Sequence, residues 1–270
     1  MCGTSNIYLI RHGDRYNWLD PDWRKKVVLC GGLSNDSPLS PIGHEMARDT
    51  ALKLKDVNAD SILSSPYLRA IQTAVPFSEQ THLPIFIEHG LSEVHHVPDL
   101  LPDARKRFIY FPHIDIDYNS LHMPIASGTE SDSIYDKPKE SFPDEYFRRI
   151  IKFSEILDEY VSEGKTVICV SHAASVALVA ALLKCDLENI PGDSDCDTNE
   201  RTDMFAPVGV YHLTKEGKGE PWKLISNGST NKHVARTDQT TSKWGFGEDA
   251  RYTWKTQFKP SSVSTINSML

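Results

Sequence analysis

The chain has 270 residues, of which 39% are apolar and 24% charged, as in an ordinary globular protein. Its net charge of −8 disfavours non-specific nucleic-acid binding, which needs a broad surplus of lysine and arginine, so any anion site must be local. Without a membrane-length apolar run, a signal peptide or a C-x-x-C pair among five cysteines, we expect a reduced protein of the cytoplasm that also enters the nucleus.

The first part of the chain alternates between strand and helix patterns. The apolar residues 7–10 predict a buried strand that runs directly into "RHGDR". The stretch "SPLSPIGHEMARDTALKLKD" predicts a helix with Ser40 as N-cap and Pro41 at its first position. Residues 62–63 predict a second strand, followed by "SSPYLRAIQTA". For this helix we expect either serine of "SSP" as N-cap and Pro66 as the first residue.

The following elements continue this alternation. "PIFIEHG" predicts a short strand, and "PDEYFRRIIKFSEILDEYVSEG" predicts an amphipathic helix that stops at Gly164. "KTVICVSH" predicts a strand buried on both faces and leads into an apolar helix, while "VGVYHLTKEGKGEPWKLISNG" predicts a hairpin at one edge. Strands that alternate with helices are typical of parallel sheets covered on both faces. We therefore expect an α/β three-layer sandwich around a mostly parallel sheet.

Three stretches interrupt the alternation. We interpret residues 95–142 as an inserted cap or lid and residues 186–203 as an acidic loop. A domain over residues 1–233 is then followed by a polar, partly disordered tail over residues 234–270. The aromatic residues of this tail either pack back on the domain or anchor a partner: Trp244, Phe246, Tyr252 and Trp254.

Two candidate metal sites fail on spacing. Asp193, Asp195 and Asp197 alternate as in a calcium loop, but Thr198 stands where that loop needs glycine and Met204 where it needs glutamate. Four histidines of the insert lack regular spacing and carboxylate partners: His95, His96, His113 and His122. We expect no metal site at either place.

Basic side chains follow three predicted strands. Arg11 and His12 come after the first strand, Arg69 lies one turn into the helix after "SSP", and His172 follows "KTVICVS". The carboxyl ends of parallel strands meet at one edge of a sheet, where ligands bind. Arginine forks and a helix N-terminus both suit phosphate oxygens. The sequence therefore predicts a site for a phosphoryl group.

His12 is the predicted nucleophile, because a neutral imidazole can attack phosphorus and carry the phosphoryl group on nitrogen. Glu93, in "GLSEVHH", is expected to protonate the leaving group and then to deprotonate water. Asp14 is an alternative acid because it lies close to His12 in the sequence. Arg15 is either a further phosphate ligand or the partner of an acid such as Asp14 or Asp20.

Five stretches occur in the order in which the histidine phosphatase superfamily carries its motifs: "LIRHG", "PLSPIGHEMA", "SSPYLRAIQTA", "LSE" and "VSHAAS". The sequence resembles this superfamily over residues 5–233, which implies a phosphoglycerate mutase-like fold. The resemblance implies His12 as the phosphorylated nucleophile and Glu93 as the proton donor. It also implies three phosphate ligands: Arg11, Arg69 and His172.

The stretch "RHGDR" is similar to the R-H-G-E-R motif of phosphatase domains in the ubiquitin-associated, SH3-containing family, which adds Arg15 to the implied phosphate ligands. The same variant is similar to the histidine-phosphatase-like subunit of the yeast RNA polymerase III factor TFIIIC. Mutases typically carry R-H-G-E-S and a nearby W-N, whereas Arg15 and Asn17-Trp18 stand here, so a mutase is disfavoured. Met46 replaces a usual glutamine that has no catalytic role.

The leading hypothesis is a phosphoric monoester hydrolase that works through a phosphohistidine and needs no metal or organic cofactor. Its substrate would be a small phosphorylated molecule or phosphotyrosine, entering past the apolar side chains of Phe108, Tyr110, Phe111 and Tyr118. The alternative is an interaction module related to the TFIIIC subunit, with a slow or idle site and protein partners on the 234–270 tail. The intact set of site residues favours retained catalysis. Neither hypothesis includes a membrane or direct nucleic-acid binding.

Overall fold

The computed structural model describes residues 3–20, 22–29, 36–93, 107–122, 140, 142–161, 164–184, 206–227 and 248–258. The acidic loop 186–203, most of the insert 95–142 and much of the tail 234–270 lie outside these residues, with His95, His96, Trp244 and Phe246 among them. None of the helices within the described ranges is long and apolar enough to cross a membrane.

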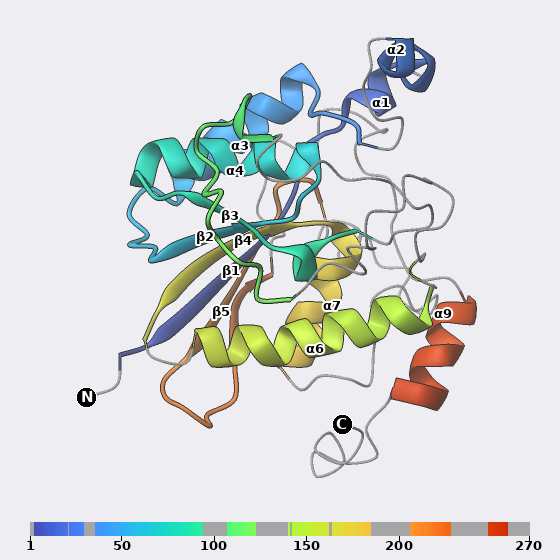
Figure 1. The fold of residues 1–270 in the computed structure, drawn as a ribbon. Helices are drawn as coiled ribbons and strands as arrows, with labels where there is room; N and C mark the ends of the chain where they lie inside the picture. Colours follow the sequence, from blue (N-terminus) through green and yellow to red (C-terminus); the bar gives the residue numbers. More distant parts are fainter. Residues whose placement is uncertain are drawn as a thin grey trace.

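A six-stranded sheet forms the centre of the fold, with the strand order β3-β2-β4-β1-β5-β6 (Figure 1). The strands are β1 (Ser5–Arg11), β2 (Ser61–Ser64), β3 (Ile85–Ile87), β4 (Thr166–Ser171), β5 (Val210–Lys215) and β6 (Lys223–Asn227). The first four are parallel to one another, while β5 and β6 form the predicted antiparallel hairpin at one edge. The expected α/β fold with a mostly parallel sheet is therefore confirmed.

The register between β1 and β4 decides where the functional side chains lie. Ile10 is paired with Val170 and Arg11 with Ser171, so the residues that follow both strands leave the sheet at the same level. The backbone N–H of His12 donates to the carbonyl of Ser171 at 2.8 Å, which extends the ladder one step beyond the strands. His12 and His172 consequently follow neighbouring strand ends.

Helices cover both faces of the sheet (Figure 1). The long helices are α3 (Pro41–Lys53), α4 (Leu68–Thr81), α6 (Asp144–Tyr160) and α7 (Ala173–Leu183), with shorter α1 (Tyr16–Leu19), α2 (Trp23–Leu29), η1 (His89–Leu91), α9 (Glu248–Thr253) and η3 (Trp254–Phe258). Helices α3 and α4 pack on the face that carries Ile10 and Ile62, whereas α6 and α7 pack on the face that carries Leu9 and Val167. Strand β4 is buried on both faces, as its apolar run predicts.

One predicted helix start is confirmed and one is wrong. Ser40 caps α3 as expected, since its Oγ accepts from Gly43 N at 3.0 Å, with Pro41 in the first turn. Helix α4 begins at Leu68, two residues after the predicted Pro66. Ser65 does not cap this helix because its hydroxyl bonds to His172 at 2.8 Å, and Asp36 Oδ1 instead accepts from Leu68 N at 2.7 Å.

The described part of the insert, residues 107–122, lies along the edge of the sheet at β3. Ile85 N donates to the carbonyl of residue 113 at 2.8 Å, and the N–H of residue 115 donates back to Ile85 at 3.0 Å. Tyr118 stacks on Phe86 with ring centroids 4.5 Å apart, and Phe111 packs against the apolar cluster below α4. These two rings cover the sheet, whereas Tyr110 is exposed.

The described part of the tail packs against the domain. Trp254 in η3 is only 1% exposed and meets the ring of Phe147 on α6 edge-on, at a centroid distance of 5.1 Å. Tyr252 on the preceding helix α9 is 71% exposed. For Trp254, the structure thus supports packing on the domain over the alternative of an exposed anchor.

Candidate active site

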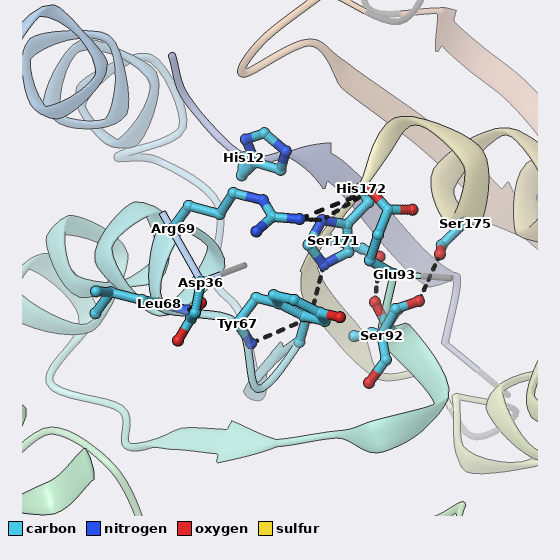
Figure 2. Close-up of polar contacts among 12 residues, drawn as sticks. His12, Asp36, Tyr67, Leu68, Arg69, Ser92, Glu93, Ser171, His172 and Ser175 are labelled. Carbon is cyan, nitrogen blue, oxygen red and sulfur yellow. Dashed lines mark hydrogen bonds and ion pairs between the residues drawn. The ribbon is translucent and has the colours of Figure 1, made fainter. Parts of the chain in front are cut away.

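Arginine, histidine and glutamate side chains meet at the carboxyl end of the parallel strands (Figure 2). The rings of His12 and His172, which follow β1 and β4, have centroids 5.3 Å apart and lie edge to face. Arg69 comes from the first turn of α4, and Glu93 comes from the segment after η1. The four predicted residues from separate parts of the chain therefore share one site.

The ring of His12 is held in a defined orientation. Its Nδ1 lies 2.7 Å from the carbonyl oxygen of Gly13, and because a carbonyl can only accept, Nδ1 carries the hydrogen. The lone pair of the neutral ring is therefore on Nε2. The loop behind the ring is fixed as well, since Gly13 N donates to Thr73 Oγ1 at 3.0 Å and that hydroxyl donates to the carbonyl of Arg69 at 2.7 Å.

The ring of His172 is fixed by two partners. Arg69 Nη2 lies 3.1 Å from Nδ1, and because a guanidinium only donates, Nδ1 accepts. The opposite nitrogen, Nε2, then carries the hydrogen and donates to Ser65 Oγ at 2.8 Å. Tyr67 packs between the two residues, with its ring 5.0 Å from that of His172 and under the guanidinium of Arg69 at 4.5 Å.

The structure distinguishes the two candidate acids. Glu93 is 31% exposed, and its Oε2 lies 3.6 Å from His172 Nδ1 and 3.7 Å from Arg69 Nη2. Asp14 is buried, and its Oδ2 accepts from the hydroxyl of Ser40 at 2.6 Å, at the start of α3. Glu93 therefore reaches both the cluster and solvent. Asp14 instead joins the loop that carries His12 to the N-cap of α3.

Three guanidinium groups dominate the electrostatics, of which Arg11 and Arg69 are buried and Arg15 is half-buried. The pKa of Arg11 and that of Arg15 are each lowered to about 10, first by burial and then by a neighbouring guanidinium. The charge of Glu93 opposes this shift and raises both pKa values. Burial likewise lowers the pKa of Arg69. The pKa of His12 lies well below its ordinary value because of burial and then the positive charges of these three arginines. His12 is accordingly neutral at neutral pH, in a pocket that favours an anion.

Arg15 lies against the aromatic ring of Trp18, with its guanidinium carbon 4.4 Å from the ring centroid. Among the residues that the structure describes, it makes no ion pair with Asp14 or Asp20, and Asp20 instead binds Lys26 at 2.6 Å. The Nε atoms of Arg15 and Arg69 are both buried and have no hydrogen-bond partner in the described part of the chain. Two buried donors in the site thus lack a partner among the described residues.

Sequence reasoning missed the residues that hold this cluster in place. Ser65, Tyr67 and Thr73 belong to the quoted stretch "SSPYLRAIQTA", but their roles depend on contacts with residues far away in the sequence. Thr73 bonds to Gly13, 60 residues earlier, and Ser65 bonds to His172, 107 residues later. Within the described ranges, no group of three or more histidine, cysteine, aspartate or glutamate side chains is arranged to hold a metal ion. The donors present suit phosphate oxygens instead.

Comparison with known proteins finds a similarity to one family. Residues 7–98 match the model of the histidine phosphatase superfamily, branch 1. The matched stretch contains four of the five principal site residues, namely Arg11, His12, Arg69 and Glu93.

The chain is also similar to a yeast transcription factor subunit in sequence and to two solved proteins in fold. The transcription factor tau 55 kDa subunit of Saccharomyces cerevisiae is 28% identical over 193 residues, which are 68% of this chain and 42% of the yeast protein. The chain thus spans less than half of that relative. The ecdysone phosphate phosphatase of Bombix mori has a TM-score of 0.60 at 19% identity, over 83% of this chain and 93% of that one. Phosphoglycerate mutase of Bacillus anthracis has a TM-score of 0.50 at 18% identity, over 87% and 96%. These two similarities establish a phosphoglycerate mutase-like fold.

Proposed function

We propose that this protein is a histidine phosphatase that hydrolyses phosphoric monoesters through a phosphohistidine at His12. One observation carries the proposal: the 2.7 Å bond from His12 Nδ1 to the Gly13 carbonyl places the ring's lone pair on Nε2, next to buried guanidinium groups. A neutral, oriented imidazole is what nucleophilic attack on phosphorus requires. The histidine phosphatase match over residues 7–98 supports the same chemistry.

In the first step, His12 Nε2 attacks phosphorus, so an N–P bond forms while the P–O bond to the leaving group breaks. Arg11, Arg15 and Arg69 hold the phosphoryl oxygens and stabilise the charge that spreads over them. His172, predicted as a further phosphate ligand, orients Arg69 instead, because its Nδ1 accepts from Nη2 and its Nε2 donates to Ser65. Glu93 transfers its proton to the departing oxygen, so that an alcohol leaves rather than an alkoxide.

In the second step, water attacks the phosphohistidine. The carboxylate of Glu93, left deprotonated by the first step, removes a proton from the water as the O–P bond forms and the N–P bond breaks. Inorganic phosphate is released, and His12 and Glu93 return to their initial states. The 31% exposure of Glu93 is consistent with this access to water.

We infer that the substrate is a small phosphorylated molecule or a phosphotyrosine. We also infer that the protein works in the cytoplasm and in the nucleus, and its similarity to a transcription factor subunit supports the nucleus. A mutase is disfavoured because Arg15, whose guanidinium lies 4.4 Å from the ring of Trp18, stands where mutases typically carry serine. Conversion of 3-phosphoglycerate to its 2-isomer measures this directly. Robust conversion would contradict the assignment as a hydrolase.

The test of the proposed function is hydrolysis of p-nitrophenyl phosphate by the wild-type protein and by His12→Ala. We expect turnover that falls to background in the variant, and a wild-type phosphoprotein whose label is lost in acid and retained in alkali, as for a P–N bond. His212→Ala is the matched control, because this histidine stacks on Tyr8 within the sheet, away from the cluster. Equal turnover by His12→Ala and the control would refute the proposal.

A second function is favoured by the similarity to the yeast tau 55 kDa subunit, over 68% of this chain. On this alternative the domain is an interaction module whose site is slow or idle. A folded wild-type protein without His12-dependent turnover on any phosphate monoester would support it. Rapid His12-dependent turnover would contradict it, and the similarity would then reflect shared ancestry rather than a shared role.

A further inference from the structure

The segment that carries Glu93 is held by a buried arginine outside the cluster described above. Arg149 lies in the second turn of α6 and is 4% exposed. Its Nη1 donates to the carbonyls of Gly90 at 3.0 Å and Ser92 at 3.2 Å and approaches that of His89 at 3.5 Å, while Nη2 donates to the carbonyl of Glu93 at 3.2 Å. One side chain thus binds the backbone of the segment that leads to the acid and of the acid itself.

Glu140 fixes the guanidinium from behind. Its Oε1 accepts from Arg149 Nε at 2.6 Å and its Oε2 accepts from Nη2 at 2.9 Å, in a two-point ion pair with both partners buried. This pairing fixes the plane of the fork, because two parallel N–H···O bonds define it. The remaining donors therefore point in set directions at the carbonyls.

The same segment is tied to the residues on either side of His172. Ser171 Oγ donates to the carbonyl of residue 91 at 2.6 Å, and Ser175 Oγ donates to that of Ser92 at 2.9 Å (Figure 2). A Cβ added at Gly90 would lie 2.1 Å from the ring of Phe153, so the segment is also packed tightly on α6. Arg149 and the two serines together set the 3.6 Å separation of Glu93 and His172.

We propose that Arg149, held by Glu140, is a positioning residue that places the Glu93 carboxyl for proton transfer to the leaving group. This inference rests on the proposed function, in which Glu93 is the acid. Arg149 reaches the acid only through backbone carbonyls, so its loss displaces Glu93 without removing a phosphate ligand. Displacements of about 1 Å are enough to reduce catalysis by about a hundredfold.

The test compares two substrates that differ in their need for an acid. Phenol has a pKa of about 10, like tyrosine, and leaves poorly without a proton, whereas the more acidic p-nitrophenol leaves readily as an anion. The kcat/KM of each substrate reports the transfer to His12, the step in which the leaving group departs. The ratio of kcat/KM for p-nitrophenyl phosphate to that for phenyl phosphate therefore measures proton donation.

Two variants test the arginine. Arg149→Lys keeps the charge beside Glu140 but loses the planar fork, and the double variant Arg149→Met/Glu140→Leu removes both charges together, which avoids an unpaired buried ion. We expect kcat/KM for phenyl phosphate to fall by at least about tenfold in each, within the range of about 10² to 10⁴ that a general acid contributes. For p-nitrophenyl phosphate we expect a fall of less than about threefold.

Lys215→Met is the matched control, because the buried Lys215 also forms an ion pair with α6, to Asp158 at 2.5 Å, but lies on β5 away from Glu93. Its substrate ratio should equal that of the wild type, while Glu93→Gln should raise the ratio at least as much as the Arg149 variants. An unchanged ratio in the folded Arg149 variants, whether both activities fall equally or neither falls, would overturn the positioning role alone. A wild-type protein without His12-dependent turnover would overturn the proposed function and the positioning role together.

Discussion

At the scale of single residues, the charge state of His12 links the site to the stability of the protein. The folded pKa of His12 lies well below its ordinary value because the ring is buried beside three guanidinium groups. In the unfolded chain the same ring titrates near 6.5. Below that pH the unfolded state binds a proton that the folded state excludes, so the free energy of unfolding must decrease as the pH falls from about 6.5 and must level off above it.

The variant His12→Asn isolates this contribution. We expect the wild-type protein to lose more stability than the variant between pH 7 and pH 5, with a difference in slope of up to about 1.4 kcal/mol per pH unit below 6.5. Urea unfolding at several pH values measures both slopes, and all other titrating groups are common to the two proteins. Parallel curves for the two proteins would mean that His12 titrates as it does in the unfolded chain.

The principal residues of the candidate site could be predicted, whereas those that position them could not. Arg11, His12 and His172 stand at the ends of apolar strands, and this local pattern is visible in the sequence. Arg149 looks like any arginine on an amphipathic helix, and its role depends on carbonyls 56 to 60 residues earlier in the chain. Such backbone-directed contacts leave no signal in the residue types of their partners.

At the scale of elements, two glycines let the loop that carries His12 cross close to the start of α3. A Cβ at Gly13 would lie 2.8 Å from the carbonyl oxygen of Gly43, and a Cβ at Gly43 would lie 2.2 Å from that of Asp14. Both clashes are with backbone, which cannot rotate aside. The contact also brings Asp14 to the Ser40 cap, so the helix and the loop that carries His12 are fixed relative to each other.

Gly43→Ala should therefore push the loop away from α3. We expect a loss of about 1–3 kcal/mol in the free energy of unfolding, typical of an overpacked site, together with a lower kcat because His12 moves with the loop. Gly217→Ala is the control, since a Cβ there would meet nothing nearer than 3.9 Å. Thermal unfolding and p-nitrophenyl phosphate turnover measure the two effects. A stable and fully active Gly43→Ala protein would show that the loop does not need this close approach.

The two serine-proline signals show why helix starts are only partly predictable. Ser40 and Ser65 each precede a proline and a helical pattern, and the local rule treats them alike. Ser40 follows the rule, but Ser65 bonds to His172, which lies 107 residues later, and the first turn of α4 is shifted to Leu68. The contact of Ser65 with His172 in the candidate site has replaced the expected helix cap. Functional sites are where local rules of this kind are expected to fail.

At the scale of the whole molecule, alternation of strands and helices was sufficient to predict the layered sheet, because each element buries an apolar face that its own sequence records. The tail differs in this respect. Residues 248–258 are polar apart from isolated aromatics, so neither helical state nor packing is evident from their pattern. Their position follows from a tertiary contact, in which Trp254 packs against the rings of Phe147 and Phe258, 5.1 Å and 6.1 Å away, and these two rings lie 5.6 Å from each other.

Substitutions in this segment test whether it is an integral part of the domain. Trp254→Ala removes a ring that is 1% exposed and joined to the core of α6 and α7, so we expect a loss of about 3–5 kcal/mol in the free energy of unfolding. Tyr252→Ala, two residues earlier and 71% exposed, should change it by less than about 0.5 kcal/mol. Urea unfolding monitored by far-ultraviolet circular dichroism compares the two. Trp254 packs on Phe147 of α6, whereas His12 follows β1 and Arg69 lies on α4. Turnover per folded molecule should therefore stay at the wild-type value in both variants. A Trp254→Ala protein as stable as Tyr252→Ala would mean that the aromatic contact contributes nothing to the fold and that the segment is free to bind elsewhere.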